Sequence, residues 1–97
     1  MNNVIFSKAL ADQTRQKIMD LTCCRWLNVS QIVEALDVSQ PTVSHHLAIL
    51  KEADLVVVRK AGKETFYTLN QERLASGCCS LAEQFAPDLQ LTLTPKP

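Results

Sequence analysis

The sequence predicts a mainly α-helical (α+β) domain that carries one small β-hairpin. Several short segments place apolar residues at helical spacing behind residues that typically cap helices. Two segments, "LVVVRK" and "ETFYTL", are instead rich in β-branched and aromatic residues and are separated by "AGK", a pattern typical of a hairpin. A chain of 97 residues has room for one modest core. We therefore expect one domain over residues 1–88, followed by a C-terminal tail over residues 89–97.

The first third of the chain is expected to form three short helices. The first is "NVIFSKAL" at residues 3–10. Asp12 is placed to cap a second helix over residues 13–24, in which both cysteines of "TCC" border apolar faces. Asn28 begins a capping box that opens a third helix, "VSQIVEAL" at residues 29–36.

The next helix completes a DNA-binding motif. Ser39 can cap it, and a proline is tolerated in its first turn because the missing amide hydrogen has no helical partner there. It continues as "TVSHHLAILKEA", with Val43, Leu47 and Leu50 facing inward. Two helices of this length joined by a three- or four-residue turn form a helix-turn-helix. Followed at once by a hairpin, this arrangement predicts a winged helix-turn-helix.

The last helix is expected to join two copies of the chain. Asn70 can cap the segment "QERLASGCCSLAEQFA" at residues 71–86, which carries two adjoining apolar stripes and a glycine that permits close packing. Two stripes are more than the helix needs to cover its own domain, so the sequence predicts a homodimer. The expected interface residues are Leu74, Cys78, Leu81 and Phe85. The tail beyond alternates Leu and Thr like a strand, but its prolines make disorder equally plausible.

Three segments resemble a known family: "ALADQTRQKIMDL", "VEALDVSQPTVSHHLAILKEADLV" and "RKAGKETFYTL". They are similar to ArsR-type bacterial repressors, and the resemblance covers roughly residues 6–86. It implies a dimeric winged-helix protein that binds a double-stranded DNA operator near its own operon. It also implies that an inducer, often a toxic metal ion, releases the protein from that operator.

The residues expected to contact DNA lie at the start of the fourth helix and on the wing. Side chains at the start of a helix in the major groove reach base edges, whereas basic side chains of a wing reach phosphate or the minor groove. The formal net charge is zero, so this prediction depends on the placement of residues rather than on bulk charge. Taken singly, the polar residues of the helix fit capping or plain solvation equally well, and each basic residue of the wing fits a plain solvated charge better. The clustering of the basic residues on one turn favours a DNA contact. The predicted contacts are Ser39, Gln40, Thr42, Ser44 and His45 on the helix, and Arg59, Lys60 and Lys63 on the wing, with His46 as a bystander.

The four cysteines occur as two adjacent pairs and are the candidate inducer site. The family's Cys-x-Cys site is absent, because Asn28 and Ser30 stand there, and residues 71–86 lack the His and Asp of its other familiar site. Thiolates are soft ligands, so the pairs favour arsenite, antimonite, copper(I) or cadmium. Adjacent helical side chains point about 100° apart, so a pair can share one ion only where the backbone loosens. The candidate ligands are Cys23, Cys24, Cys78 and Cys79; no metal is expected to be needed for folding.

Other readings of the cysteines stay open. Each cysteine can simply fill core space, since free cysteine is often buried. In some members of the family that the chain resembles, oxidants or reactive sulfur link a cysteine of the second helix to one of the last helix. A small cysteine-dependent enzyme with His45 or His46 as base is a remote alternative, because both histidines lie on the helix expected to face DNA.

No apolar run reaches the roughly 18 residues of a membrane span. We therefore expect a cytoplasmic protein with no membrane partner, in which the thiols stay reduced unless they bind metal or are redox-active.

Overall fold

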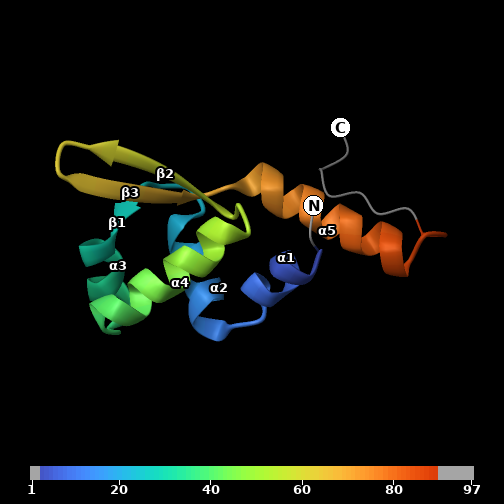
Figure 1. The fold of residues 1–97 in the computed structure, drawn as a ribbon, viewed down its shortest axis with the longest axis horizontal. Coiled ribbons are helices and arrows are strands. Elements are labelled where there is room, and N and C mark those ends of the chain that lie inside the picture. Colours follow the sequence, from blue (N-terminus) through green and yellow to red (C-terminus); the bar gives the residue numbers. More distant parts are fainter. Residues whose placement is uncertain (1–2, 90–97) are drawn as a thin grey trace.

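The computed structural model describes residues 3–89, which form helices packed beside a small antiparallel sheet (Figure 1). The predicted winged helix-turn-helix is confirmed. The expected tail lies outside the described residues, apart from Leu89. The elements run in the order α1 Asn3–Leu10, α2 Gln13–Thr22, β1 Leu27–Asn28, α3 Val29–Leu36, α4 Gln40–Glu52, β2 Val56–Ala61, β3 Glu64–Leu69 and α5 Gln71–Phe85.

All four predicted helix caps are confirmed. In each, a short polar side chain accepts a hydrogen bond from a backbone amide of the first helical turn, which would otherwise lack a partner. At the start of α3 the capping box is complete, because the Gln31 side chain also accepts from the backbone amide of Asn28 at 2.9 Å. The caps and their amide donors are Asp12 with Arg15, Asn28 with Gln31, Ser39 with Thr42, and Asn70 with Arg73.

Helix α2 ends at Thr22, two residues before the predicted end at residue 24. The backbone carbonyls of Thr22 and Cys23, at the end of the helix, have no helical donor. Instead they accept from Thr68 Oγ1 at 3.0 Å and from Gln71 Nε2 at 2.7 Å. Both cysteines of the first pair therefore lie beyond the helix.

The sheet contains a strand that the sequence did not reveal. β2 and β3 pair as the predicted hairpin around a turn at Gly62, whose φ of +63° suits glycine. β1 adds a third, two-residue strand by pairing Leu27 with Tyr67 and Asn28 with Phe66. This short strand ties the segment after α2 to the wing.

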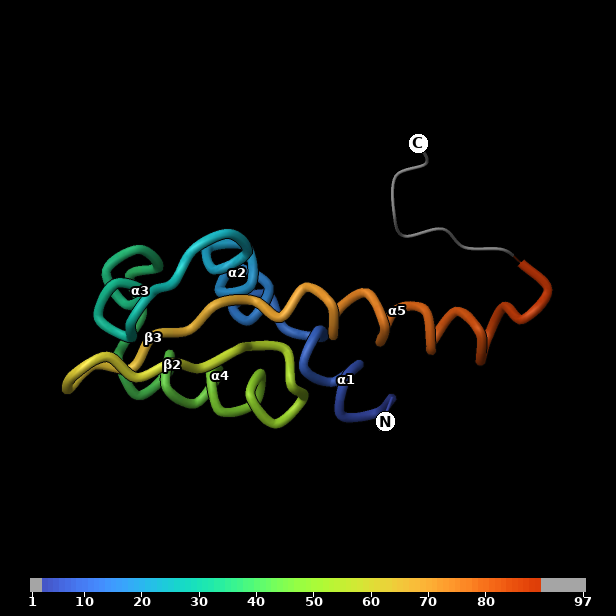
Figure 2. The backbone as a smooth tube through the Cα atoms, turned by 90° about the horizontal axis from the view of Figure 1, so that it is seen from above, coloured from blue at the N-terminus to red at the C-terminus, as the bar shows by residue number. Residues whose placement is uncertain are grey.

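The four helices α1, α2, α3 and α4 and the base of the hairpin share one hydrophobic core. The inward residues predicted on α4, Val43, Leu47 and Leu50, are all buried. α5 runs past this core, and its C-terminal half projects beyond the other elements (Figure 2). Gly77 of α5 lies against the ring of Phe6, where a Cβ atom would overlap the ring, so the close approach expected of this glycine is made to α1 of the same chain. No described helix is long and apolar enough to cross a membrane.

Candidate DNA-reading surface and cysteine pairs

The start of α4 presents the polar side chains expected of a DNA-reading helix. Figure 1 places it at the same end of the molecule as the tip of the β2–β3 hairpin, far from the end of α5. The hydroxyls of Ser39 and Thr42 lie 2.8 Å apart, so both are partly engaged in capping. The exposed predicted contacts on this helix are Ser39, Gln40, Thr42, Ser44 and His45.

The wing carries its three predicted basic residues, Arg59, Lys60 and Lys63, all exposed. Arg59 is more than a solvated charge, because its guanidinium carbon lies 4.3 Å from the ring centroid of Trp26. The face of an indole ring attracts a cation, so this contact favours one position of the Arg59 side chain. Sequence reasoning missed this contact, which joins the segment after α2 to the wing.

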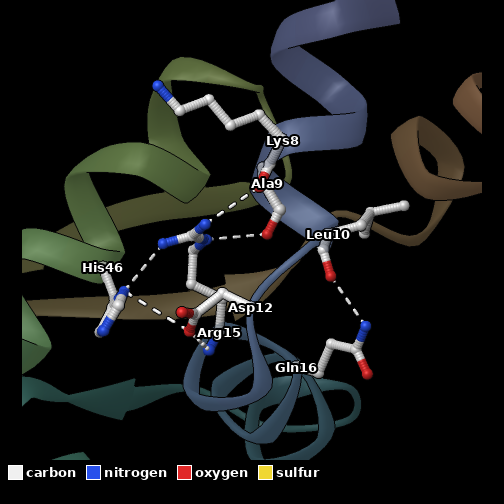
Figure 3. A network of polar contacts seen from close by, with 7 residues as sticks. All are labelled: Lys8, Ala9, Leu10, Asp12, Arg15, Gln16 and His46. Atoms are coloured by element: carbon white, nitrogen blue, oxygen red, sulfur yellow. Dashed lines mark hydrogen bonds and ion pairs between the residues drawn. The ribbon is translucent and has the colours of Figure 1, made fainter.

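A buried polar network that the sequence did not predict attaches α4 to α1 and α2 (Figure 3). Arg15 is only 7% exposed. It donates from Nε to the carbonyl of Ala9 at 2.9 Å, from Nη2 to the carbonyl of Lys8 at 3.0 Å, and from Nη1 to His46 Nδ1 at 3.0 Å. One side chain thus fixes the end of α1 and the middle of α4 relative to α2.

The chemistry of this network defines the protonation of His46. A guanidinium can only donate, so Nδ1 of His46 must accept and carries no proton. Burial lowers the pKa of His46, and the nearby charges of Arg15 and His45 lower it further, whereas Asp12, with Oδ2 3.9 Å from Nδ1, raises it. The Asp12 carboxylate accepts a hydrogen bond from the Arg15 backbone amide, and this bond lowers the pKa of Asp12. The predicted bystander His46 is therefore a neutral structural link.

One sequence signal for this network existed. Arg15 is in the first turn of α2, where the helix dipole disfavours a cation. A basic residue in that position indicates a specific partner, here the carbonyls at the end of α1 and the ring on α4.

The first cysteine pair converges on one point. Past the end of α2, the Sγ atoms of Cys23 and Cys24 lie 3.3 Å apart, with Cys24 exposed and Cys23 half-buried. The sulfur of Cys24, through this contact, is the main cause that raises the pKa of Cys23, and burial adds to it. Two soft donors that already face one another fit a thiophilic ion that needs few protein ligands.

The second pair lies within the regular helix α5. Cys78 and Cys79 are both half-buried, and Cys78 packs against the hydrophobic core. Among residues 3–89, no three His, Cys, Asp or Glu side chains are grouped so that they can hold a metal ion. Within the described part of one chain, the four thiols therefore lie as two separate pairs. The sequence left open whether the pairs act together or separately, and within one subunit or across two.

The predicted interface residues divide into two groups. Leu74, Cys78 and Leu81 are half-buried against the core of their own chain. Phe85 is 74% exposed, as is Val4 of α1, and with Leu81 they line an apolar groove of about 460 Å³ between α1 and α5. The end of α5 and the outer face of α1 thus carry exposed apolar surface among the described residues.

Comparisons with a family model, with known sequences and with solved structures all match this chain to bacterial regulators. Residues 12–58 match the model of the bacterial regulatory protein, arsR family. The chain is 41% identical over 70 residues to the transcriptional repressor SdpR of Bacillus subtilis, covering 72% of this chain and 76% of that protein. It is 42% identical over 67 residues to the arsenical resistance operon repressor of Staphylococcus xylosus, covering 69% of this chain and 64% of that protein. A solved structure of reduced HlyU from Vibrio cholerae N16961 superposes with a TM-score of 0.67 at 32% identity, over 86% of each chain.

Proposed function

Because this chain belongs to the arsR family of bacterial regulatory proteins, we propose that it is a transcriptional repressor that binds a double-stranded DNA operator as a homodimer. The observation that carries the proposal is the exposed polar start of α4 beside a basic wing. The helix supplies groups that can address base edges, and the wing supplies charges for phosphate.

The operator proposal is tested with purified protein and a labelled fragment carrying an inverted repeat from upstream of its own gene. Replacing Ser44 and His45 by Ala removes two exposed groups and leaves the core intact, so operator affinity falls while the unfolding midpoint stays the same. Lys51→Ala, at the far end of the same helix, is the matched control. Affinity should also fall with salt between about 50 and 300 mM. Salt-independent binding contradicts the proposed phosphate contacts.

The proposed dimer uses the groove between α1 and the end of α5. It places one recognition helix in each of two major-groove segments about one helical turn apart. Phe85 gives a sharper test than Leu81, since Leu81 also packs on its own core. A glutamate at position 85 is solvated in a lone chain but is buried unpaired in the dimer, at a cost of several kcal/mol. Sedimentation should show monomers for Phe85→Glu and dimers for the control Glu83→Gln; a tight Phe85→Glu dimer refutes the assignment.

The proposed inducer is a thiophilic species bound by cysteine, with trivalent arsenic or antimony as the first choice and other soft ions after it. Support comes from the soft donor set and from the relative described as an arsenical resistance operon repressor. An inducer releases DNA only as far as it favours the released state, and a tenfold effect corresponds to ~1.4 kcal/mol. Release titrations with arsenite, cadmium and copper(I) on Cys-to-Ser variants of each pair test this. If neither double variant alters any response, the cysteines are not the sensor.

A second candidate is a thiol-redox or reactive-sulfur sensor. Free thiols just after α2 and on α5 favour it, as does the similarity to a solved structure described as reduced HlyU. Intact mass after treatment with oxidant or polysulfide separates the two chemistries. A loss of two hydrogens or a gain of sulfur indicates redox sensing, whereas retention of arsenic indicates ligation.

A further inference from the structure

We propose that Cys23 and Cys24 form a self-contained two-thiol site for trivalent arsenic, and that occupancy is transmitted to the wing of the same chain through Trp26 and Arg59. This inference rests on the proposed DNA-binding function and specifies its regulation. It assigns sensing to the first cysteine pair alone and requires no thiol from α5.

The separation of the two sulfur atoms fits this ligand. For bonds of about 2.3 Å, two sulfur ligands at a right angle lie about 3.3 Å apart, whereas two at the tetrahedral angle lie about 3.8 Å apart. The Sγ atoms of Cys23 and Cys24 are 3.3 Å apart. Trivalent arsenic carries a lone pair and forms bonds near right angles, so it fits this spacing better than a tetrahedral ion does. A tetrahedral ion would also need further protein ligands, and no third His, Cys, Asp or Glu joins the pair within residues 3–89.

The chemistry is an exchange of ligands without electron transfer. Arsenous acid has three As–OH bonds. When two thiols replace two hydroxides, two As–S bonds form, two As–O bonds break, and the two thiol protons leave with the hydroxides as two molecules of water. An arsenical with one organic substituent reacts in the same way: phenylarsine oxide takes two thiols and releases one molecule of water. Two protein thiols therefore saturate such a compound.

The segment that carries the pair is attached to the hairpin and to α5 at several points. The backbone carbonyl of Thr22 accepts a hydrogen bond from Thr68 of β3, and that of Cys23 accepts one from Gln71 of α5. Two residues after Cys24, Trp26 stacks on Arg59 of β2. The chain then pairs with β3 as β1.

These attachments give a route from the thiols to the wing. A chelate fixes the side-chain torsions of both cysteines and the peptide between them. That constraint is passed along a single intervening residue, Arg25, to the indole ring on which Arg59 rests. Moving the ring changes where the Arg59 guanidinium lies, and Arg59 is one of the proposed phosphate contacts. The recognition helix, held through Arg15 at the other end of α2, stays in place.

The chain supplies its own reporter for this route, because Trp26 is its only tryptophan. The experiment titrates reduced full-length protein with phenylarsine oxide and follows intact mass, Trp26 fluorescence and operator affinity. We expect one adduct per chain, a change in fluorescence that saturates with the adduct, and at least tenfold weaker operator binding. Cys78→Ser/Cys79→Ser should keep the adduct, the fluorescence change and the fold-loss of operator binding on addition of phenylarsine oxide. Cys23→Ser/Cys24→Ser, and the single variant Cys24→Ser, should lose the adduct and both responses.

The outcomes separate this inference from the proposed function. Release that persists in Cys23→Ser/Cys24→Ser but vanishes in Cys78→Ser/Cys79→Ser overturns the inference and leaves the repressor proposal standing. An adduct at Cys23 and Cys24 with unchanged Trp26 fluorescence overturns the transmission route. Failure of the unmodified protein to bind any operator fragment counts against the proposed function, while the mass and fluorescence measurements still decide whether the two-thiol site exists and moves Trp26.

Discussion

The two ends of α2 are built in opposite ways. At its start, Arg15 is buried and donates to two carbonyls of α1 and to His46 of α4 (Figure 3). Beyond its end, Cys24 and Arg25 are exposed, and one of the contacts to the wing is a cation lying over a half-buried indole. The first end is held by directional hydrogen bonds in a site shielded from water. The second end is held by side-chain hydrogen bonds to the carbonyls of Thr22 and Cys23, by the pairing of β1 with β3 and by the Arg59–Trp26 contact.

This difference assigns different tasks to the two ends. A helix anchored at one end transmits a disturbance at the other end mainly to whatever is attached there. The buried network holds the recognition helix in register with the core, whereas the thiol segment is attached to the hairpin. Input at the cysteines is therefore expected to reach the wing before it reaches α4.

The largest expected effect comes from comparing the two arginines of this region. Arg15→Met leaves the carbonyls of Lys8 and Ala9 and the His46 ring without their charged donor, and we expect a loss of about 3 kcal/mol in the free energy of unfolding. Arg25→Met, the matched control, removes one exposed bond to the Leu21 carbonyl and should change stability by less than about 0.5 kcal/mol. Urea unfolding of both variants measures the difference; equal losses would show that the two ends are not distinct.

The cysteines should show the same contrast on a smaller scale. Cys78→Ser places a hydroxyl where the thiol packs against the core, which should cost about 1 kcal/mol. Cys24→Ser changes an exposed side chain and should cost less than about 0.5 kcal/mol. Thermal and urea unfolding under reducing conditions measure both. A greater loss in Cys24→Ser would mean that the loop thiol has a structural task.

A weaker, pH-dependent effect is expected at the anchored end. The charged groups that face His46 are Arg15, Asp12 and His45, and burial with the two cationic neighbours lowers its pKa below 6.5. Between that lowered pKa and 6.5 the unfolded chain binds more protons than the folded chain, so the free energy of unfolding decreases as the pH falls through this range. Asp12, whose pKa is also lowered, adds a separate loss only below about its ordinary value of 3.8.

Urea unfolding between about pH 7 and pH 5 tests this dependence. His46→Gln keeps an acceptor for Arg15 but cannot be protonated, so its stability should vary less with pH than that of the wild type. His45→Gln, which alters the exposed neighbour, should retain most of the variation. A wild-type stability that rises as the pH falls through this range would contradict the neutral His46.

What the sequence predicted well depends on contacts within one helical turn or one hairpin. Asp12, Asn28 and Ser39 were identified as caps because each partner amide is three residues away. The early end of α2 was missed, and the side chains that bind the carbonyls of Thr22 and Cys23 are 46 and 48 residues away in the sequence. The Arg15–His46 contact, across 31 residues, was also missed.

In the candidate site, too, the sequence predicted what depends on local contacts and missed what depends on tertiary structure. The exposed residues at the start of α4 and on the wing follow from the helical period and the hairpin, whereas the relation between the two cysteine pairs does not. A regular helix keeps Cys78 and Cys79 pointing apart, and the irregular chain after Thr22 lets Cys23 and Cys24 converge. Only the tertiary structure shows that identical dipeptides have different geometry.

The smallest expected effect concerns Arg59, which contacts the segment after α2 by stacking on Trp26 and is also a proposed phosphate contact. Arg59→Lys keeps the positive charge but loses the planar group that stacks on Trp26, an attraction of about 0.5–1 kcal/mol at an exposed site. The salt dependence of operator binding should therefore be unchanged in Arg59→Lys, whereas Arg59→Ala should lower its slope by about one. Trp26 fluorescence should change in both variants, because both lose the guanidinium that lies over the ring. If fluorescence instead stays at the wild-type value in Arg59→Lys, the lysine replaces the guanidinium over the Trp26 ring. The segment after α2 would then be coupled to Arg59 of the wing by positive charge and not by the planar group.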